Sequence, residues 1–385
     1  MKTWKHLMAQ IDDCVIEEAL RVGSKRKKER PAIRRLINDY DKSVASFNQF
    51  IEDILTGKQK PLVHRVKEIN DGFKLKKRMI MQPYFTKSKP EQWLHHLVIQ
   101  ILQPMFMKGM YEFSCSSVPD RGMHYGKKYL ERYIKEHKGK VRYVLKADIR
   151  HFYDNVNIDI LKERFRQSIK DDDFLKLVFF ILDSNTGYTK DGKLYKTGLP
   201  IGFYTSQWFA NWFLQPFDHY IKENLGAEFY MRYADDIVVL SSNKRKLRKI
   251  LTAIQAYLKT IDLELKPNYQ IFQFDYVGTD EQHHGRFIDF MGFKFYSNRT
   301  TIRKSIFIRA CRLAARLSKK LIISWYNASR MMSYIGWFLK TKTYLAKKEK
   351  IESNVNYKGL AKIISMHDKK VAKLCKQENE LKKAG

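Results

Sequence analysis

The sequence predicts an α+β fold whose centre is a split β-α-β sheet of the ferredoxin-like type. Residues 141–148 alternate apolar and polar side chains, as a half-buried strand does. Residues 228–240 read as two further strands around a short acidic turn, which is typical of a hairpin. Helical periodicity separates these strands, and beyond about residue 300 the chain is expected to be all helical. This order of strands and helices is that of a split β-α-β unit.

The composition favours a protein that binds nucleic acid. The 385 residues include 73 Lys and Arg against 41 Asp and Glu, a formal net charge of +32, far more than solubility requires. Such a charge attracts a polyanion strongly. Hydrophobic residues make up 44% of the chain, enough to bury a core, and the length exceeds that of a typical single domain. We therefore expect two or three structural units with nucleic acid as the main partner.

The sequence does not support a membrane protein, a zinc protein or a nucleotide-binding protein with a glycine-rich loop. The longest apolar run, residues 177–182, is far shorter than the roughly 20 residues that span a bilayer, and there is no signal peptide or lipidation motif. The four cysteines lie far apart without zinc-ligand spacing, which fits a reducing cytoplasm. Phosphate-binding loops of the Walker type and dinucleotide-binding glycine motifs are absent from the sequence. We expect a cytoplasmic protein without membrane contact, in which carboxylates and metal would bind any nucleotide.

The region before residue 140 is expected to be mainly helical with one β-rich stretch. Its first 50 residues look helical and contain a basic run, residues 25–30, that we expect to be an exposed arm or a solvated helix face. Residues 61–85 mix short β-like runs with basic residues. Across residues 91–110, apolar side chains recur at three- and four-residue intervals, which predicts an amphipathic helix.

Further elements fill the space between and after the predicted strands. Residues 158–180 are expected to be helical, residues 185–198 to form a turn-rich hairpin, and residues 206–224 to form an aromatic-rich helix. A second amphipathic helix is expected over residues 247–258, behind the acidic hairpin.

A helix over residues 305–324 is predicted to carry two stripes. The apolar stripe comprises Ala310, Leu313, Leu317 and Leu321. The basic stripe comprises Arg309, Arg312, Arg316, Lys319 and Lys320. The basic stripe suits the backbone of a nucleic-acid duplex, although a solvated face would show the same pattern.

Three aspartates are candidates for a metal site. Asp148 ends the first predicted strand, and Asp235 and Asp236 lie at the hairpin turn, so they can meet only if these strands are neighbours in one sheet. Mg²⁺ prefers oxygen ligands and leaves positions for substrate phosphates. Two such ions can activate a primer 3′-hydroxyl and stabilise a leaving pyrophosphate. An Asp-Asp pair at a turn, taken alone, is more often simple turn chemistry.

At these residues the sequence resembles the reverse transcriptase family. Tyr233-Ala234-Asp235-Asp236 matches the Tyr-X-Asp-Asp signature of that family. Residues 145–153 (LKADIRHFY) look like its first catalytic motif, and Phe290-Met291-Gly292-Phe293 looks like its primer-grip turn. The three motifs occur in the family's order, and the resemblance covers about residues 60–345.

The resemblance implies the right-hand polymerase fold, with fingers, a palm built on the split β-α-β core, and a helical thumb. The segments expected for these parts are an N-terminal helical and basic segment at 1–60, fingers at 61–140, a palm at 141–297, and a thumb with a basic tail at 298–385.

It also implies roles for individual residues. Asp148, Asp235 and Asp236 would hold two Mg²⁺ ions, for which Mn²⁺ could substitute, with the backbone carbonyl of Ile149 as an extra ligand. Tyr153 would lie under the incoming sugar, where its ring would clash with a 2′-hydroxyl and favour deoxynucleotides; a core aromatic is the alternative. The other residues implied to bind the nucleotide are Lys76, Arg78, Ile201, Gly202 and Gln207.

Residues 198–207 (GLPIGFYTSQ) indicate a subfamily. Many reverse transcriptases carry Gln-Gly at the centre of this motif and Ser-Pro at its end, whereas this chain has Ile201-Gly202 and Ser206-Gln207. Both changes resemble the enzymes of diversity-generating retroelements, which copy a template-repeat RNA into adenine-mutagenised cDNA. Residues 114–126 look like the family's fingers–palm loop, but Val118 replaces the usual Arg, so its nucleic-acid contact would come from elsewhere, such as Arg121.

This subfamily implies a bacterial or phage-encoded enzyme with several partners. They are an RNA template, a cDNA or primer strand, deoxynucleoside triphosphates, and a small basic helical oligomer called the accessory variability determinant. A defence-associated, retron-type or group II-type reverse transcriptase is the alternative. A catalytically idle scaffold that binds nucleic acid is a third reading, against which the three intact aspartates argue.

Overall fold

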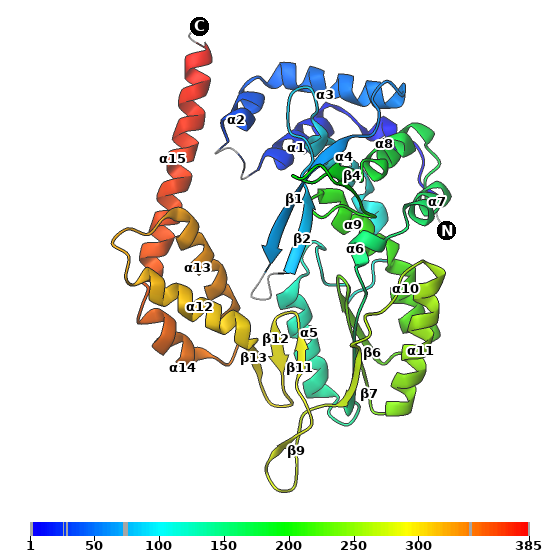
Figure 1. Ribbon diagram of the computed structural model, residues 1–385, viewed down its shortest axis with the longest axis vertical. Helices are drawn as coiled ribbons and strands as arrows, with labels where there is room; N and C mark the ends of the chain where they lie inside the picture. The colour runs from blue at the N-terminus through cyan, green and yellow to red at the C-terminus, as the bar shows by residue number, and fades with distance from the viewer. Residues whose placement is uncertain (1–2, 26, 28–29, 72–75, 339–340, 384–385) are drawn as a thin grey trace. The chain divides into compact units, whose positions relative to one another are not determined.

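The computed structural model describes residues 3–25, 27, 30–71, 76–338 and 341–383 (Figure 1). The chain divides into two compact units, and both contain helices and strands. Unit 1 comprises Met1–Ser117, Asp148–Asn224 and Ala253–Pro267, and unit 2 comprises Val118–Ala147, Leu225–Thr252 and Asn268–Gly385. The predicted α+β class is therefore confirmed. Within the described ranges, no helix combines the length and apolar character needed to cross a bilayer.

Unit 1 begins with helices, as the sequence predicts. They are a short 3-10 turn, η1 (Met8–Gln10), and the helices α1 (Asp13–Ser24), α2 (Pro31–Asn38) and α3 (Tyr40–Leu55). Asp12 caps α1, because its carboxylate accepts a hydrogen bond from the Val15 N–H at 2.8 Å. The next helix, α4 (Glu91–Met107), is the amphipathic helix predicted at 91–110, and its Trp93 ring packs edge-on against Phe47 of α3.

A four-stranded sheet in unit 1 has the order β2-β1-β4-β5. Its strands are β1 (Val63–Asp71), β2 (Lys76–Met81), β4 (Thr186–Tyr188) and β5 (Leu194–Lys196). β1 pairs antiparallel with β2 and parallel with β4. This confirms the β-rich stretch predicted at 61–85 and the hairpin predicted at 185–198. At Gly187 a Cβ would lie 2.6 Å from the carbonyl oxygen of His64, so only glycine permits this strand pairing.

The remaining helices of unit 1 are shorter than the sequence predicts. They are α6 (Phe152–Asn155), α7 (Ile158–Ser168), α8 (Asp172–Asp183), α9 (Tyr204–Phe213), α10 (Gln215–His219) and the π-helical η2 (Tyr220–Asn224). The single helix expected at 158–180 is divided because Ile169 is extended and bridges Trp4, and Asp171 then caps α8. The helix expected at 206–224 is likewise divided, at Leu214.

Unit 2 contains the predicted split β-α-β sheet. Its strands are β3 (Tyr143–Asp148), β6 (Phe229–Tyr233), β7 (Asp236–Ser241) and β8 (Gln270–Gln273), in the order β6-β7-β3-β8. Only the last residue of β3, Asp148, is assigned to unit 1. The first strand in sequence thus lies between the third and the fourth, which is the ferredoxin-like order. Helix α5 (Met123–Glu136) precedes the sheet in sequence, and α11 (Lys244–Thr260) follows β7 at the place where the sequence predicts an amphipathic helix.

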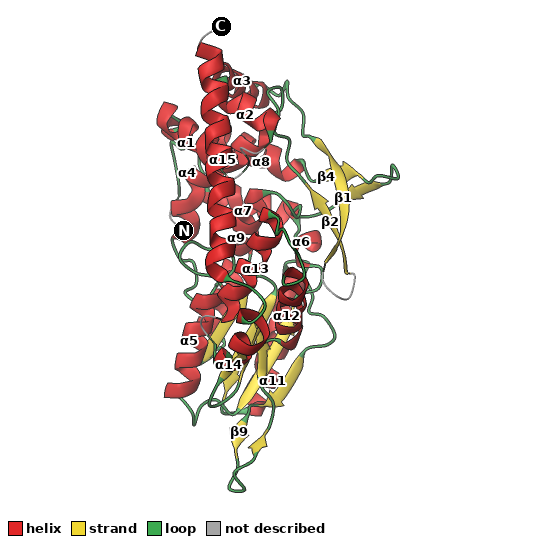
Figure 2. Cartoon of the chain, turned by 90° about the vertical axis from the view of Figure 1, so that its left-hand side faces the viewer, coloured by secondary structure: helices red, strands yellow, loops and turns green. Residues whose placement is uncertain are grey.

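Two small antiparallel sheets follow in unit 2. One is the exposed hairpin of β9 (Tyr276–Val277) and β10 (His283–His284), whose β9 is labelled in Figure 2. The other has the order β11-β12-β13, with β11 (Ile288–Phe290), β12 (Phe293–Phe295) and β13 (Thr300–Ile302). The strand β13 corrects the expectation that the chain is purely helical from about residue 300.

The C-terminal part of unit 2 is helical. Its helices are α12 (Lys304–Leu317), α13 (Trp325–Phe338), α14 (Tyr344–Lys347), the π-helical η3 (Lys348–Glu352) and α15 (Tyr357–Lys383). The helix predicted at 305–324 ends at Leu317, so the placement of Leu321 in an apolar stripe is wrong: Leu321 is 100% exposed. A physical reason lies in the next residues, since β-branched Ile322 and Ile323 favour helix weakly, and Ser324 precedes α13 and accepts a hydrogen bond from the Asn327 N–H at its start.

Candidate active site

Asp148 is held at the end of β3 by the chain segment that follows α11. Its backbone carbonyl accepts a hydrogen bond from Lys266 N–H at 2.8 Å, and its carboxylate forms an ion pair with the Lys266 ammonium. The neighbouring Ile149 is fully buried and forms an antiparallel bridge with Leu265. These contacts fix the backbone while 26% of the Asp148 side chain stays exposed. Sequence analysis did not identify this lysine, because no spacing pattern links it to Asp148.

Asp235 and Asp236 belong to the hairpin of β6 and β7. Tyr233 pairs with Asp236, so Ala234 and Asp235 form the two-residue loop. Ala234 has φ +56°, as the first loop residue of a tight hairpin does, and this conformation is strained for alanine. The guanidinium of Arg232, a fully buried side chain, donates a hydrogen bond to the Ala234 carbonyl at 3.0 Å. A buried cation that the sequence did not reveal therefore braces this turn.

The donor atoms suit a hard divalent ion. Asp148 ends β3, and Asp236 begins β7, the neighbouring strand in the sheet. Half-buried carboxylates are the oxygen ligands that Mg²⁺ prefers. Across the described ranges, no group of three or more His, Cys, Asp or Glu side chains is gathered for a metal ion. An ion bound by Asp148 would also compete with Lys266 for that carboxylate.

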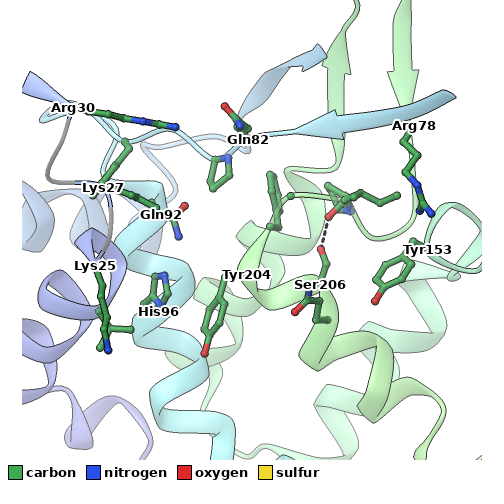
Figure 3. A pocket seen from close by; sticks show the side chains of 18 residues that line it. Lys25, Lys27, Arg30, Arg78, Gln82, Gln92, His96, Tyr153, Tyr204 and Ser206 are labelled. Atoms are coloured by element: carbon green, nitrogen blue, oxygen red, sulfur yellow. Dashed lines mark hydrogen bonds between the residues drawn. The ribbon is translucent and has the colours of Figure 1, made fainter. Parts of the chain in front are cut away.

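A cavity of about 550 Å³ lies within unit 1 (Figure 3). Five residues implied to bind the nucleotide line it although they are far apart in sequence: Arg78, Tyr153, Ile201, Gly202 and Gln207. The side chain of the sixth, Lys76, lies outside the described part of the chain. Figure 3 shows Arg78, from β2, near Tyr153, from α6. The structure thus gathers every predicted nucleotide-site side chain that it describes.

Glycine is required where the 198–207 segment meets β2. Gly202 has φ +121°, and a Cβ there would lie only 2.0 Å from the carbonyl oxygen of Met81. The N–H of Met81 donates a hydrogen bond to the carbonyl of the preceding residue, Ile201, at 3.0 Å. The backbone of Ile201 is therefore held against β2 without help from its side chain, which is left to line the cavity.

The same segment also fixes Tyr153. The N–H of Leu199 donates a hydrogen bond to the Tyr153 carbonyl at 2.7 Å, and the N–H of Gly198 donates one to the Asp154 carbonyl at 2.9 Å. A Cβ at Gly198 would lie 2.8 Å from the Tyr153 carbonyl oxygen, so glycine permits the approach. Phe152, the other aromatic of this motif, is buried. Tyr153 is thus the ring of this pair that faces the cavity.

A buried ionic network lies behind the segment. The carboxylate of Glu91 accepts hydrogen bonds from His64 Nε2 at 2.8 and 3.0 Å, and His95 Nε2 lies 3.6 Å from it. His95 Nδ1 lies 2.8 Å from the Thr205 hydroxyl, and the Phe203 ring packs against both histidines. Burial raises the pKa of Glu91, but the hydrogen bonds and charges of the two histidines outweigh it and lower that pKa to about 2.

The predicted primer-grip residues form the turn between β11 and β12. Phe290 pairs with Phe293, and both are fully buried, so Met291 and Gly292 form a two-residue loop. Both loop residues have positive φ, 51° and 83°, as a type I′ hairpin requires. A Cβ at Gly292 would lie 2.6 Å from the Trp337 ring. The predicted turn is therefore a tight hairpin packed on α13.

The arginines predicted to bind nucleic acid lie in unit 2. Arg309, Arg312 and Arg316 are on α12, whose opposite positions, Ala310, Leu313, Ala314 and Leu317, are buried in the core of the helical part. The amphipathic character predicted for this helix is thus confirmed over Lys304–Leu317, where the helix ends. Arg121 is the last residue of a turn, in which its N–H donates a hydrogen bond to the Val118 carbonyl. Val118 is buried, so its apolar side chain packs in the core.

In the basic run at 25–30, Lys25 and Arg30 are exposed, as expected, and Lys27 is half-buried. Lys25, Lys27 and Arg30 line the same cavity as Tyr153 and Ile201, and residues 26, 28 and 29 lie outside the described ranges. Composition alone gave no reason to separate this run from the other basic residues of so charged a chain.

Comparisons with known proteins agree with this geometry. Residues 76–294 match the family described as reverse transcriptase (RNA-dependent DNA polymerase). The retron Ec73 reverse transcriptase of Escherichia coli is 28% identical over 152 residues, which are 35% of this chain and 44% of that protein. The chain thus spans less than half the length of this curated relative.

Two solved structures show the same fold. Telomerase from Candida tropicalis in complex with a fragment of telomeric RNA is 16% identical, with a TM-score of 0.50 over 86% of this chain and 58% of that chain. The apo telomerase from the same organism is 14% identical, with a TM-score of 0.50 over 70% and 52% of the two chains. They support the right-hand polymerase fold. Because the family match covers more than half of its residues, the chain belongs to the reverse transcriptase family.

Proposed function

We propose that this chain is an RNA-directed DNA polymerase that works by two-metal phosphoryl transfer. The observation that carries the proposal is the strand order, in which β3, ending at Asp148, is the neighbour of β7, beginning at Asp236. Membership of the reverse transcriptase family supports it. Primer extension on an RNA template with Mg²⁺ and deoxynucleotides tests it, and the absence of DNA product, with any accessory protein supplied, would contradict it.

The chain's acidic residues would hold the metal. Asp148, Asp235 and Asp236, with the backbone carbonyl of Ile149, would bind Mg²⁺ or Mn²⁺. Two such ions, when bound, activate the primer 3′-hydroxyl and stabilise the leaving pyrophosphate. The buried Arg232 would keep the turn that carries Asp235 in one conformation. Lys266 would release Asp148 as the ion binds.

The cavity in unit 1 would bind the deoxynucleotide. Arg78 would hold the triphosphate with its forked guanidinium, together with Lys76. Tyr153 would place its ring under the sugar, and Ile201 and Gly202 would line the space beside the nascent base pair. The primer-grip turn and the α12 arginines would hold the duplex, as parts of a palm at 141–297 and a thumb at 298–385.

We further propose that the enzyme serves a diversity-generating retroelement, copying a template-repeat RNA into adenine-mutagenised cDNA with an accessory variability determinant. Ile201-Gly202 and Ser206-Gln207 support this subtype by resemblance. The gene would then be bacterial or phage-encoded and the protein cytoplasmic. A neighbouring template repeat, variable gene and small accessory reading frame would support the assignment.

A retron-type enzyme is the second candidate. The 28% identity to the retron Ec73 reverse transcriptase favours it. A neighbouring structured noncoding RNA or toxin gene, with faithful copying of adenine, would decide for this candidate.

Replacing Ile201 with Gln should make copying more faithful. A glutamine amide can hydrogen-bond the sugar or backbone of the nascent pair, whereas isoleucine cannot, and such a bond contributes about 0.5–1.5 kcal/mol net. We expect errors opposite template adenine to fall by up to roughly tenfold. Sequencing of cDNA made by both enzymes on one adenine-containing RNA measures this.

The matched control for this change is Ile201→Leu. It keeps an apolar side chain. The hydrogen bond from the Met81 N–H to the carbonyl of residue 201 involves only the backbone, so both variants can form it. Equal error rates in the wild type and in Ile201→Gln would show that Ile201 does not set fidelity. Faithful copying by the wild type with its accessory protein would count against the mutagenic subtype.

Tyr153→Ala should admit ribonucleotides. Removing the ring opens space beside the 2′ position, and steric discrimination of this kind is worth about 1–3 kcal/mol, or roughly 10–200-fold. Competitive incorporation of ribo- and deoxynucleotides measures the preference. Tyr153→Phe, which keeps the ring, should retain it. If Tyr153→Ala leaves the preference unchanged, Tyr153 is a packing residue and the gate lies elsewhere; the buried Phe152 is the less suitable alternative.

A further inference from the structure

The cavity in unit 1 has two cationic ends. At one end lie Arg78 and Tyr153, and at the other lie Lys25, Lys27 and Arg30, from the segment that links α1 to α2 (Figure 3). His96 and Tyr204 lie between them. The nucleotide proposed above accounts for the first end only. The residues at the second end form a separate group of cations and aromatic rings, and the proposed nucleotide does not contact them.

Among the described residues, the second end carries positive charge and no carboxylate lines the cavity beside it. The described residues that line the cavity include four Lys or Arg and no Asp or Glu. The Lys27 ammonium is half-buried, donates a hydrogen bond to the Gly23 carbonyl at 2.8 Å, and lies 5.3 Å from the centre of the Phe85 ring. Burial and the charge of Arg30 lower the pKa of Lys27. An anion bound here would relieve both effects.

Flat rings lie beside these cations. His96 and Tyr204 stack with their ring centres 4.2 Å apart and their planes at 21°. Burial and the charge of Lys27 lower the pKa of His96 to about 3, so its ring is neutral near pH 7. Tyr204 is the first residue of α9 and follows Ile201 by three positions. A neutral stacked pair next to cations is the combination that binds single-stranded nucleic acid, whose bases stack while its phosphates contact Lys and Arg.

We propose that Lys25, Lys27 and Arg30 bind the phosphates of the single-stranded RNA template that has yet to be copied, with His96 and Tyr204 as a surface for its bases. The proposal rests on the proposed polymerase function. Three cations along one segment suit a chain of successive phosphates, whereas a lone triphosphate is served by the Arg78 end. The continuous cavity then leads the template toward Ile201, where the next base would pair.

The experiment measures the binding of primer–template duplexes with a blunt end or with a single-stranded 5′ RNA overhang. The test variant is the triple change Lys25→Gln, Lys27→Gln and Arg30→Gln. The control is Lys244→Gln, Arg245→Gln and Lys249→Gln, which removes the same charge from exposed positions on α11. Circular dichroism and thermal melting confirm that each variant folds. A second variant, Tyr204→Leu, tests the stacking surface without a change of charge.

In the wild type and the control, we expect the duplex with an overhang to bind more tightly than the blunt duplex. In the triple variant, this gain in affinity should be smaller by a factor of at least about ten. The salt dependence of the overhang contribution should fall by about 2 in logarithmic slope, because each phosphate contact on a single strand contributes about 0.7. Tyr204→Leu should weaken overhang binding without changing this slope.

Three outcomes would overturn the proposal. In the first, the triple variant and the α11 control lose the same amount of affinity for the overhang. In the second, the overhang does not change the affinity of the wild type. In the third, the triple variant keeps its affinity for the overhang but has a raised KM for deoxynucleotides. The last would place these cations in the nucleotide site. Because binding is measured without catalysis, an absence of DNA synthesis by the wild type would contradict the polymerase function separately.

Discussion

Asp235→Asn should abolish DNA synthesis while leaving nucleic-acid binding nearly intact. The substitution removes one negative charge from the set of carboxylates proposed to hold Mg²⁺, and loss of a single charge-stabilising catalytic group already costs roughly 10²–10³-fold in rate. Binding depends on a chain with a net charge of +32, to which one neutralised carboxylate adds little. Primer extension and duplex affinity, measured on the same preparation, should therefore separate.

A matched control is available in the exposed hairpin loop between β4 and β5. Asp191→Asn makes the same chemical change at an exposed turn residue and should leave synthesis unchanged. The isosteric amide keeps the size of the Asp235 side chain, and the Arg232 bond to the Ala234 carbonyl does not involve that side chain. Ordinary synthesis by Asp235→Asn at physiological Mg²⁺ would remove Asp235 from the catalytic set.

The sequence predicted the sheet well because its strands carry a clear signal. Alternation in residues 141–148 and the acidic hairpin at 228–240 gave the strands β3, β6 and β7, and the order along the chain gave the split β-α-β arrangement. Arg78, Tyr153 and Ile201, which the resemblance assigns to nucleotide binding, line one cavity, and their roles stay predictions.

Other features could not be predicted because they depend on burial in three dimensions. Arg232 lies in a strand that is buried on both faces, so the alternation that marks a half-buried strand does not apply, and no sequence pattern marks this cation as buried. Lys25 and Arg30 are exposed, as the sequence indicates, but their place beside the cavity that Lys27 also lines depends on the folded chain. The end of α12 at Leu317 depends on weak local propensities rather than on a proline or glycine.

The Glu91 network had no sequence signal, since one glutamate and two histidines in a charged chain are unremarkable by composition. Its geometry joins three parts of unit 1. The carboxylate accepts hydrogen bonds from His64 of β1 and from the Tyr84 N–H, both at 2.8 Å. His95, beside the carboxylate, is within hydrogen-bond distance of the Thr205 hydroxyl of α9, at 2.8 Å. All three ionisable side chains are buried, so a change at the centre leaves partners that water cannot satisfy.

Glu91→Gln should therefore destabilise the folded chain by about 3–5 kcal/mol, the range for breaking a buried ion pair by changing one partner. Urea or guanidinium unfolding, followed by tryptophan fluorescence, measures the loss of unfolding free energy. Glu18→Gln is the control, because Glu18 and Arg21 form an exposed pair on α1, and such pairs contribute about 0–1 kcal/mol.

The loss should also depend on pH in a defined direction. The pKa of Glu91 is lowered from 4.5 to about 2 in the folded chain, so its ionised form stabilises the fold above about pH 4.5, and this stabilisation disappears as the pH falls toward 2. Glutamine does not titrate in this range. The difference in unfolding free energy between the wild type and Glu91→Gln should be largest near neutral pH and should shrink below about pH 4.5. A difference that is constant with pH would mean that the network acts through packing alone, with no contribution from the charge of Glu91.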